Sequence, residues 1–408
     1  MKRSAVLRGN RDFTLLWLGG LVSGLGSQTA TLALPLLVLA KTGSGTLAGL
    51  VGTLAGIAAL VTMLPGGAVA DAVERRRLML VCEAGSAVAA FALTTAVVAD
   101  RAVYLAAVLV VLANAVLGSL YLPASAGLLK RMVPAAQLPD AAALLQARTS
   151  GVRLAGPLLG GALYGIGPAV PFAVEAVGLV FAVGCLAVLR TKAAPTTRLV
   201  AVVKPKEFAA GFGYLLRHPF LRTMLGIGAV LNLVFGGAML GFVTVAARLD
   251  PSGRSSGLIA ALAGAGGLVG ALLSPRVRAD EHPRGWVLVV CLVCAAGMAA
   301  VGWWPSVLTL AVVVGCSFLV AATATTVFAT VVMIRTPAEL QGRVQSAAGF
   351  VSMAVTPAGP VAVGALLDGV GVATTFGLLA VVMAVAAVPA WLAPSLRTPA
   401  PAFEHVER

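Results

Sequence analysis

The sequence predicts an all-α integral membrane protein with about twelve transmembrane helices in two pseudo-symmetric six-helix bundles. Three observations lead to this fold class: a very apolar composition, apolar runs of membrane-spanning length along the whole chain, and an internal repeat of half the chain length. Of the 408 residues, 59% are hydrophobic and only 11% are charged. This balance is too apolar for a water-soluble domain.

The apolar runs are each about 20 residues long, which is enough for a helix to cross a hydrocarbon core of about 30 Å. They lack the alternating pattern of barrel strands, so helices are the structure expected in lipid. The expected helices cover residues 13–37, 47–69, 78–98, 103–127, 141–165, 170–189, 221–247, 255–275, 285–303, 306–333, 344–367 and 372–393.

The net charge of +14 indicates topology and not nucleic-acid binding. When the N-terminus is placed in the cytoplasm, 23 of the 29 lysines and arginines fall in cytoplasmic segments and four fall outside, while Arg148 and Arg153 lie within helices. Positive charge on the cytoplasmic side orients membrane proteins. Both termini are therefore expected in the cytoplasm. The first apolar run has spanning length and no cleavage site, so it is expected to remain as the first helix.

The chain offers no pattern typical of a metal site, a bound cofactor or an enzyme. All five cysteines fall within expected helices, and Cys291 and Cys294 have no histidine or carboxylate near them in the sequence, so we interpret them as small packing residues. The three histidines, His218, His282 and His405, fall in loops or the tail. No nucleotide-binding loop of the form G-x-x-x-x-G-K-[ST] occurs, which argues against ATP-driven transport.

A comparison of the sequence with itself reveals a repeat at an offset of 203 residues. The offset aligns AGPLLGGAL (155–163) with AGPVAVGAL (358–366), and it aligns Arg75 with Arg278 without a gap. Two parallel repeats of six helices are typical of alternating-access carriers, with the substrate near the midplane between them. The predicted parts are an N-terminal bundle (1–190), a cytoplasmic linker (191–220), a C-terminal bundle (221–396) and a cytoplasmic tail (397–408).

Two motifs carry a resemblance to a known family. GGAVADAVERRR (66–77) resembles the loop signature G-x-x-x-D-R-x-G-R-R of the major facilitator superfamily: Gly67, Asp71, Arg75 and Arg76 match, while Ala72 and Glu74 replace the usual Arg and Gly. GPLLGG (156–161) resembles the fifth-helix signature G-P-x-x-G-G of the antiporters, shifted by one position upstream of Gly156. The resemblance covers essentially the whole chain and is strongest with bacterial drug, macrolide and siderophore exporters.

Each motif has two physical interpretations. Asp71 could accept hydrogen bonds from Arg75 to Arg77 or from a helix end of the other half, as a latch that breaks between states; alternatively, the arginines only anchor the loop in the cytoplasm. In the fifth helix, Pro157 could bend the segment and Gly156, Gly160 and Gly161 could give it a smooth face for rocking. Tight static packing explains the same residues.

Arg148 and Arg153 are the costly residues of the fifth helix, since an arginine at a helix centre costs about 2.5 to 3.5 kcal/mol on insertion scales. Arg148 lies about two turns from the cytoplasmic end and could reach the surface by snorkelling. Arg153 lies near the middle of the helix. We predict that it lines the aqueous cavity, with a buried ion pair as the alternative.

The other candidate site residues are two carboxylates and three amides. Glu175 in the sixth helix and Glu83 in the third could carry a coupled proton, although structural ion pairing explains each of them as well. Gln28, Asn114 and Asn232 could hydrogen-bond a substrate or join two helices. The C-terminal half has no ionisable side chain deep in its helices, only hydroxyls such as that of Thr323, which favours an amphipathic or hydrophobic substrate.

The predicted function is therefore export of a small amphipathic molecule across the bacterial cytoplasmic membrane, as a monomer and in exchange for protons. Well-known proton antiporters carry an acid in the first helix and often an arginine in the fourth, whereas this chain has only Gln28 and Asn114 there. A proton-coupled importer of the same fold is the close alternative. A membrane protein with a signalling or structural role would not need the repeat.

Overall fold

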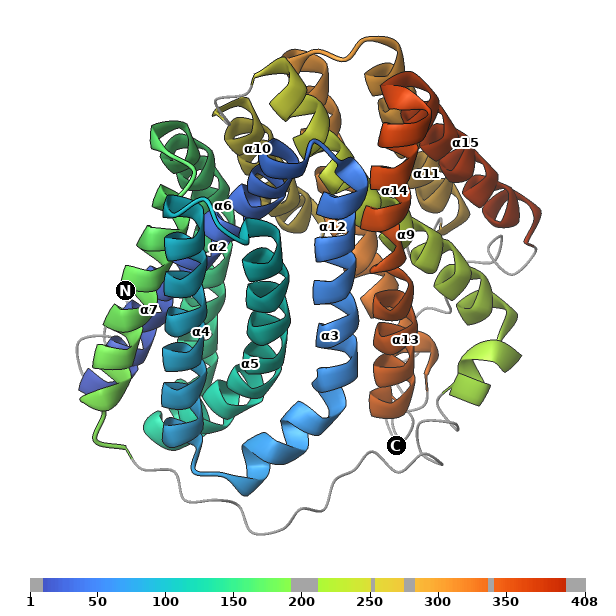
Figure 1. Cartoon of the computed structure of the whole chain (residues 1–408). Coiled ribbons are helices and arrows are strands. Elements are labelled where there is room, and N and C mark those ends of the chain that lie inside the picture. The colour runs from blue at the N-terminus through green and yellow to red at the C-terminus, as the bar shows by residue number, and fades with distance from the viewer. Residues whose placement is uncertain (1–9, 192–211, 251–253, 275–282, 337–340, 394–408) are drawn as a thin grey trace, which may run out of the picture. The chain divides into compact units, whose positions relative to one another are not determined.

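The structure is a computed structural model that describes residues 10–191, 212–250, 254–274, 283–336 and 341–393. Within these ranges the regular structure is helical and contains no strand. Figure 1 labels the long helices, which are α2 (Arg11–Thr42), α3 (Gly45–Ala72), α4 (Arg75–Val98), α5 (Val103–Met132), α6 (Leu138–Ile166), α7 (Val170–Ala187), α9 (Pro219–Leu249), α10 (Arg254–Leu273), α11 (Pro283–Trp303), α12 (Val307–Arg335), α13 (Gln341–Val355), α14 (Ala358–Gly369) and α15 (Gly371–Leu392).

These helices confirm the predicted class of a helical membrane protein. Eleven segments of the described chain are long and apolar enough to cross a membrane. α6 is not among them, because its two arginines and its glycines lower its mean hydropathy. Its 29 residues nevertheless give a length of about 43 Å, which exceeds the hydrocarbon thickness of about 30 Å. With α6, the predicted number of about twelve is reached in the described ranges.

The chain divides into two compact units, the first built around α2 to α7 and the second around most of the later helices. Residues 192–211 of the predicted linker (191–220) and all of the predicted tail (397–408) lie outside the described residues. The described end of the linker has a helical stretch at 212–217 and the start of α9 at Pro219. The predicted domain boundaries remain a prediction.

The two halves of the repeat differ in the shape of one pair of corresponding helices. The sequence predicts one helix over residues 344–367, but the structure has α13 and α14, separated at Thr356 and Pro357. Pro357 lacks the N–H that would continue the ladder, and its ring opposes the carbonyl of the preceding turn. Its counterpart at the repeat offset is Leu154, so α6 runs without a break and even continues through its own Pro157.

The first unit begins and ends at the same end of its bundle. Asp12 in the first turn of α2 accepts hydrogen bonds from the backbone N–H (2.8 Å) and the hydroxyl (2.5 Å) of Thr191, which follows α7. At the same end, Asn10 caps α2 by accepting a bond from the N–H of Phe13, and its amide donates to the carbonyl of Met132 at the end of α5. A chain that starts and ends on the same side of a bundle must cross it an even number of times, which agrees with the six helices from α2 to α7.

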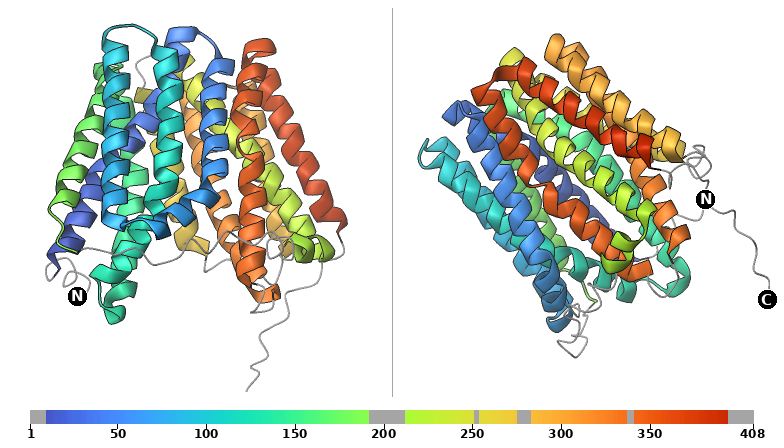
Figure 2. Two further views of the ribbon diagram at one scale, coloured as in Figure 1. Left: turned by 60° about the horizontal axis from the view of Figure 1, so that its bottom comes forward. Right: turned by 90° about the vertical axis from the view of Figure 1, so that its right-hand side faces the viewer.

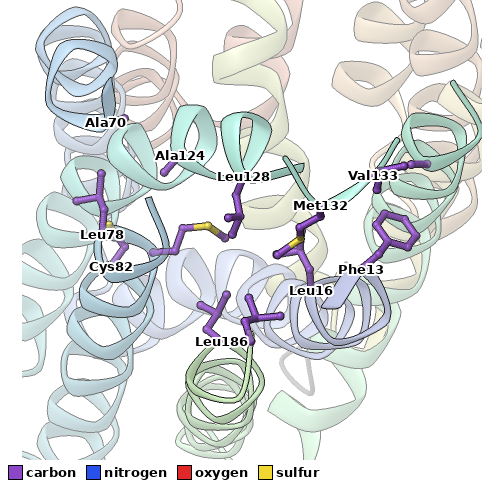
Figure 3. Packing of buried hydrophobic residues seen from close by; sticks show 13 residues of the cluster. Phe13, Leu16, Ala70, Leu78, Cys82, Ala124, Leu128, Met132, Val133 and Leu186 are labelled. Carbon is purple, nitrogen blue, oxygen red and sulfur yellow. The ribbon is translucent and has the colours of Figure 1, made fainter. Parts of the chain in front are cut away.

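Apolar side chains fill the space between the helix ends on this side. Figure 3 shows the cluster, in which Phe13 of α2, Met79 of α4 and Leu128 of α5 are completely buried. The two further views in Figure 2 show the blue-to-green helices of this unit running side by side. The interior of the bundle is therefore held by packing between α2, α4, α5 and the end of α7.

Helix α2 lies between α6 and α7 and contacts both at glycines. On the α6 side, an added Cβ at Gly156 would overlap the Gln28 side chain, and one at Gly160 would lie 2.9 Å from the carbonyl oxygen of Thr29. On the α7 side, an added Cβ at Gly26 would lie 2.8 Å from the Cα of Glu175. Small residues let helix backbones approach in this way in membranes, so these glycines set the spacing of the three helices.

We expect Gly160→Ala to destabilise the protein by about 1–3 kcal/mol, because the added methyl group meets the α2 backbone and not a flexible side chain. Gly151 lies on the same helix with open space around it. Gly151→Ala should therefore be neutral or stabilising by up to about 1 kcal/mol, as expected from helix propensity. The apparent Tm of the purified variants measures both effects. Equal Tm values for the two variants would contradict this packing.

Candidate functional site

A buried carboxylate in α4, Glu83, has polar partners from two other helices of the first unit. Glu83 is only 6% exposed. Its side chain is hydrogen-bonded to those of Ser23 on α2 and Tyr121 on α5. Its Oε2 atom is buried without a hydrogen-bond partner in the described part of the chain. A buried carboxylate of this kind requires either a proton or a nearby positive charge.

Arg148 provides a positive charge that acts on this carboxylate. Its Nη1 atom donates long hydrogen bonds to the carbonyls of Leu16 (3.3 Å) and Trp17 (3.4 Å) on α2. The guanidinium group lies against Gly20, where any Cβ atom would overlap it. Arg148 forms no ion pair with a carboxylate of the described residues. Its charge instead acts through space on Glu83 and Tyr121.

Glu83, Ser23, Tyr121 and Arg148 form one polar group inside the first unit, which we call the Glu83 cluster. Four different helices contribute to it, and it lies among apolar side chains. A carboxyl group can bind and release a proton. The hydroxyls of Ser23 and Tyr121 can hydrogen-bond to either form, and the arginine stabilises the anion. The cluster therefore has the components of a proton-binding site.

The second predicted carboxylate, Glu175 on α7, is separate from this cluster. Its residue is 3% exposed, and its side chain is hydrogen-bonded to that of Ser27 on α2. No hydrogen bond or ion pair joins Glu175 to a lysine or arginine of the described chain. Glu175 thus lacks the charged partner that Glu83 has.

Arg153 differs from Arg148 although both lie on α6. Arg148 shares the α2-facing side of the helix with Val152, Gly156 and Gly160, whereas Arg153 is one position off that side and is exposed. Among the described residues it makes no hydrogen bond or ion pair. The alternative of a buried ion pair for Arg153 therefore has no support within the described part of the bundle, and its role in a cavity stays a prediction.

The three predicted amides have different surroundings. Gln28 packs its Cβ against Gly156. Asn114 on α5 has a buried Oδ1 without a hydrogen-bond partner in the described ranges. In the second unit, Asn232 is exposed and donates to the carbonyl of Gly228 in its own helix at 2.9 Å. The structure does not bring these three side chains into one site within either unit.

The arginines of the predicted gating loop bind backbone carbonyls of the first unit. Arg75 donates to the carbonyl of Gly127 on α5 at 3.4 Å. Arg76 donates to those of Leu186 (2.9 Å) and Ala187 (2.5 Å) at the end of α7, where a cation also complements the helix dipole. Gly67 has open space around it, and the side chain of Asp71 lies outside the described residues. The latch between Asp71 and these arginines remains a prediction.

Motif reasoning did not identify Tyr121, Ser23, Ser27 or Gly20. None lies in a recognisable motif, and each becomes relevant only when a second helix packs beside it. The sequence offered one sign of them: Ser23 and Ser27 are two serines one turn apart in an apolar helix, so they lie on the same side of α2.

In the second unit, the Oγ1 atom of Thr323 donates to the carbonyls of Gly270 (3.2 Å) and Leu319 (2.9 Å), a role in helix packing.

Comparisons with known proteins agree with this architecture. The sequence profile of the Major Facilitator Superfamily matches residues 16–360. The multidrug efflux pump Tap of Mycolicibacterium fortuitum is 27% identical over 403 residues, which cover 94% of this chain and 96% of the pump.

Solved structures show the same fold at low sequence identity. A bacterial homologue of the human lysosomal transporter Spinster, in an inward-facing and unoccupied conformation, aligns with a TM-score of 0.74 at 16% identity, covering 95% of this chain and 97% of that one. The nucleoside transporter NupG aligns with a TM-score of 0.71 at 14% identity and covers 93% of this chain and 98% of that one.

Proposed function

Because the chain belongs to the Major Facilitator Superfamily and is thus a membrane transporter and not an enzyme, we propose that it exports a small amphipathic organic molecule from a bacterial cell in exchange for protons. Transport proceeds by alternating access. The protein works as a monomer in the cytoplasmic membrane, with both termini in the cytoplasm. The loop residues Gly67, Asp71, Arg75 and Arg76 act as the cytoplasmic gate.

The observation that carries the proposed direction is the likeness to a multidrug efflux pump over nearly the full length of both chains. The apolar second half supports an amphipathic or hydrophobic substrate, since a sugar or a multiply charged anion needs several convergent polar groups. A drug or a siderophore-like compound fits this class.

The Glu83 cluster supports proton coupling. Ionisable groups inside a membrane are costly and typically mark ion or proton pathways. Glu83 can cycle between a protonated state and an anion that Arg148 stabilises, and this change alters the charge of the first unit in a way that can be linked to its conformational state. This cluster takes the place of the first-helix acid of well-known antiporters.

Arg153→Ala is expected to abolish substrate-driven proton movement in proteoliposomes while leaving the apparent Tm unchanged. Because Arg153 is exposed and has no partner among the described residues, its removal leaves no buried group unpaired. The matched control is Arg101→Ala, an exposed arginine between α4 and α5, which should behave as wild type. Normal transport by Arg153→Ala would reject its role in the cavity.

The direction is tested in cells. Deleting the gene should make the host more sensitive to hydrophobic antibiotics and raise the accumulation of ethidium, and re-expression should reverse both effects. A loss of uptake in the deletion strain would favour the importer.

A further inference from the structure

Two buried carboxylates from different helices meet α2 one turn apart. Glu83 of α4 is hydrogen-bonded to Ser23, and Glu175 of α7 is hydrogen-bonded to Ser27. Residues four apart lie on the same side of a helix, with about 5–6 Å between their Cβ atoms. This gap is too long for a direct hydrogen bond between the two hydroxyls, and it is of the size that one water molecule bridges.

The two carboxylates lie on opposite sides of the middle of the bundle. Arg76 at the start of α4 donates to Ala187 at the end of α7, so these two ends lie together. Glu83 is in the third turn of α4 from this end, whereas Glu175 is in the second turn of α7 from the opposite end. Ser23 and Ser27 lie in the middle third of α2, which has 32 residues. A spatial series of polar groups therefore crosses the central part of the first unit, in the order Glu175, Ser27, Ser23 and Glu83.

The charges around the two carboxylates differ. Glu83 has Tyr121, Arg148 and Cys82 beside it. Helices α2, α4 and α6 pack against α7, and the ionisable side chains of α4 and α6 in this region are those of Glu83, Cys82, Arg148, Arg153 and Tyr164. None of these is hydrogen-bonded to Glu175. Two carboxyl groups in unlike environments are suited to act as proton donor and acceptor.

We propose that Glu175 is a second proton-binding group and that Ser27 and Ser23 connect it to Glu83, so that the coupled proton travels within the first unit along α2. This inference rests on the proposed proton antiport. It assigns the outer end of the path to Glu175 and the inner end to the Glu83 cluster.

The transfer is balanced without any further reactant. The O–H bond of Glu175 breaks as its proton binds the Ser27 oxygen, while the hydroxyl proton of Ser27 passes to a bridging water molecule. That water molecule gives one of its protons to Ser23, whose hydroxyl proton passes to the Glu83 carboxylate. The serines and the water molecule each gain one proton and lose one. Glu175 becomes the anion and takes a new proton from the outer side, and Glu83 releases its proton to the inner side.

The first test uses proteoliposomes loaded with ethidium and follows proton entry as ethidium leaves. Glu175→Gln and the double variant Ser23→Ala/Ser27→Ala should each reduce proton entry at least about tenfold, as expected when a proton-transfer group is lost. Asp100→Asn, an exposed acid paired with Lys41, serves as the control and should retain the wild-type rate. Normal proton entry by Glu175→Gln would overturn the path. A wild-type protein that moves no protons would instead contradict the proposed antiport.

The second test requires no substrate. Infrared spectra of the purified full chain in lipid should contain the C=O band of a protonated carboxylic acid at neutral pH. The band should weaken in Glu175→Gln and remain in Glu83→Gln, and in the Glu83→Gln background it should shift in frequency with Ser27→Ala because the hydrogen bond is gone. A band that keeps its full intensity in Glu175→Gln, or that does not move in Ser27→Ala/Glu83→Gln, would overturn the assignment even if transport is proton-coupled.

Discussion

The Glu83→Gln variant is expected to lose proton-driven transport down to the level of protein-free vesicles while retaining exchange that needs no proton. Glutamine has nearly the same shape and can keep hydrogen bonds to Ser23 and Tyr121, but it cannot bind and release a proton. The measurements are ethidium movement driven by an imposed pH gradient, and exchange of labelled for unlabelled ethidium at equal pH.

The two assays separate coupling from folding. A misfolded variant would lose both activities, whereas loss of the coupling group removes only the first. Asp100→Asn should keep both, because Asp100 is exposed and its partner Lys41 lies at the surface. If Glu83→Gln still responds to the pH gradient as wild type does, Glu83 is not the coupling residue.

The Arg148→Met variant is expected to be clearly less stable than the wild type. It leaves the Glu83 carboxylate buried without its positive charge, and removing one partner of a buried charge pair costs about 3–5 kcal/mol. Because Arg148 and Glu83 are not in direct contact and Glu83 can take up a proton, we expect a smaller loss of about 1–3 kcal/mol. The apparent Tm of the purified protein measures the effect.

Two further variants identify the cause. In Arg148→Met/Glu83→Gln no charge remains unpaired, so at least half of the lost stability should return. Arg153→Met changes the same residue type on the same helix at an exposed position, and it should shift the Tm little. An Arg148→Met protein as stable as wild type, or a double variant no more stable than the single one, would contradict the electrostatic role of Arg148.

The fold class was predictable because it depends on properties that the chain displays locally. The lengths of the apolar runs indicate membrane spans, the charge asymmetry indicates orientation, and the repeat indicates two bundles. None of these three properties depends on how side chains pack. The break at Pro357 was not predictable from proline alone: a proline in a helix interior removes a backbone donor, yet α6 continues through Pro157 and α2 through Pro35. The apolar run over residues 344–367 predicts one continuous helix, because the length of an apolar run does not indicate a break within it.

The surroundings of the polar residues were predictable only in part. Arg148 and Glu83 were each identified as unusual within a membrane helix, but nothing in their own segments indicates that they lie near each other. Their relation depends on Gly20, which makes room for the guanidinium group on a helix far away in the sequence. Snorkelling was the simplest solution for an isolated helix, whereas the packed bundle gives the arginine the carbonyls of α2 and the charge of Glu83.

The most direct measurement is proton movement driven by substrate in vesicles that contain only the wild-type protein. Vesicles loaded with ethidium at equal internal and external pH are diluted into ethidium-free buffer, and a trapped pH indicator reports the internal pH. Proton antiport predicts internal acidification as ethidium leaves, and none in protein-free vesicles. Protein-dependent loss of ethidium at constant internal pH would contradict it.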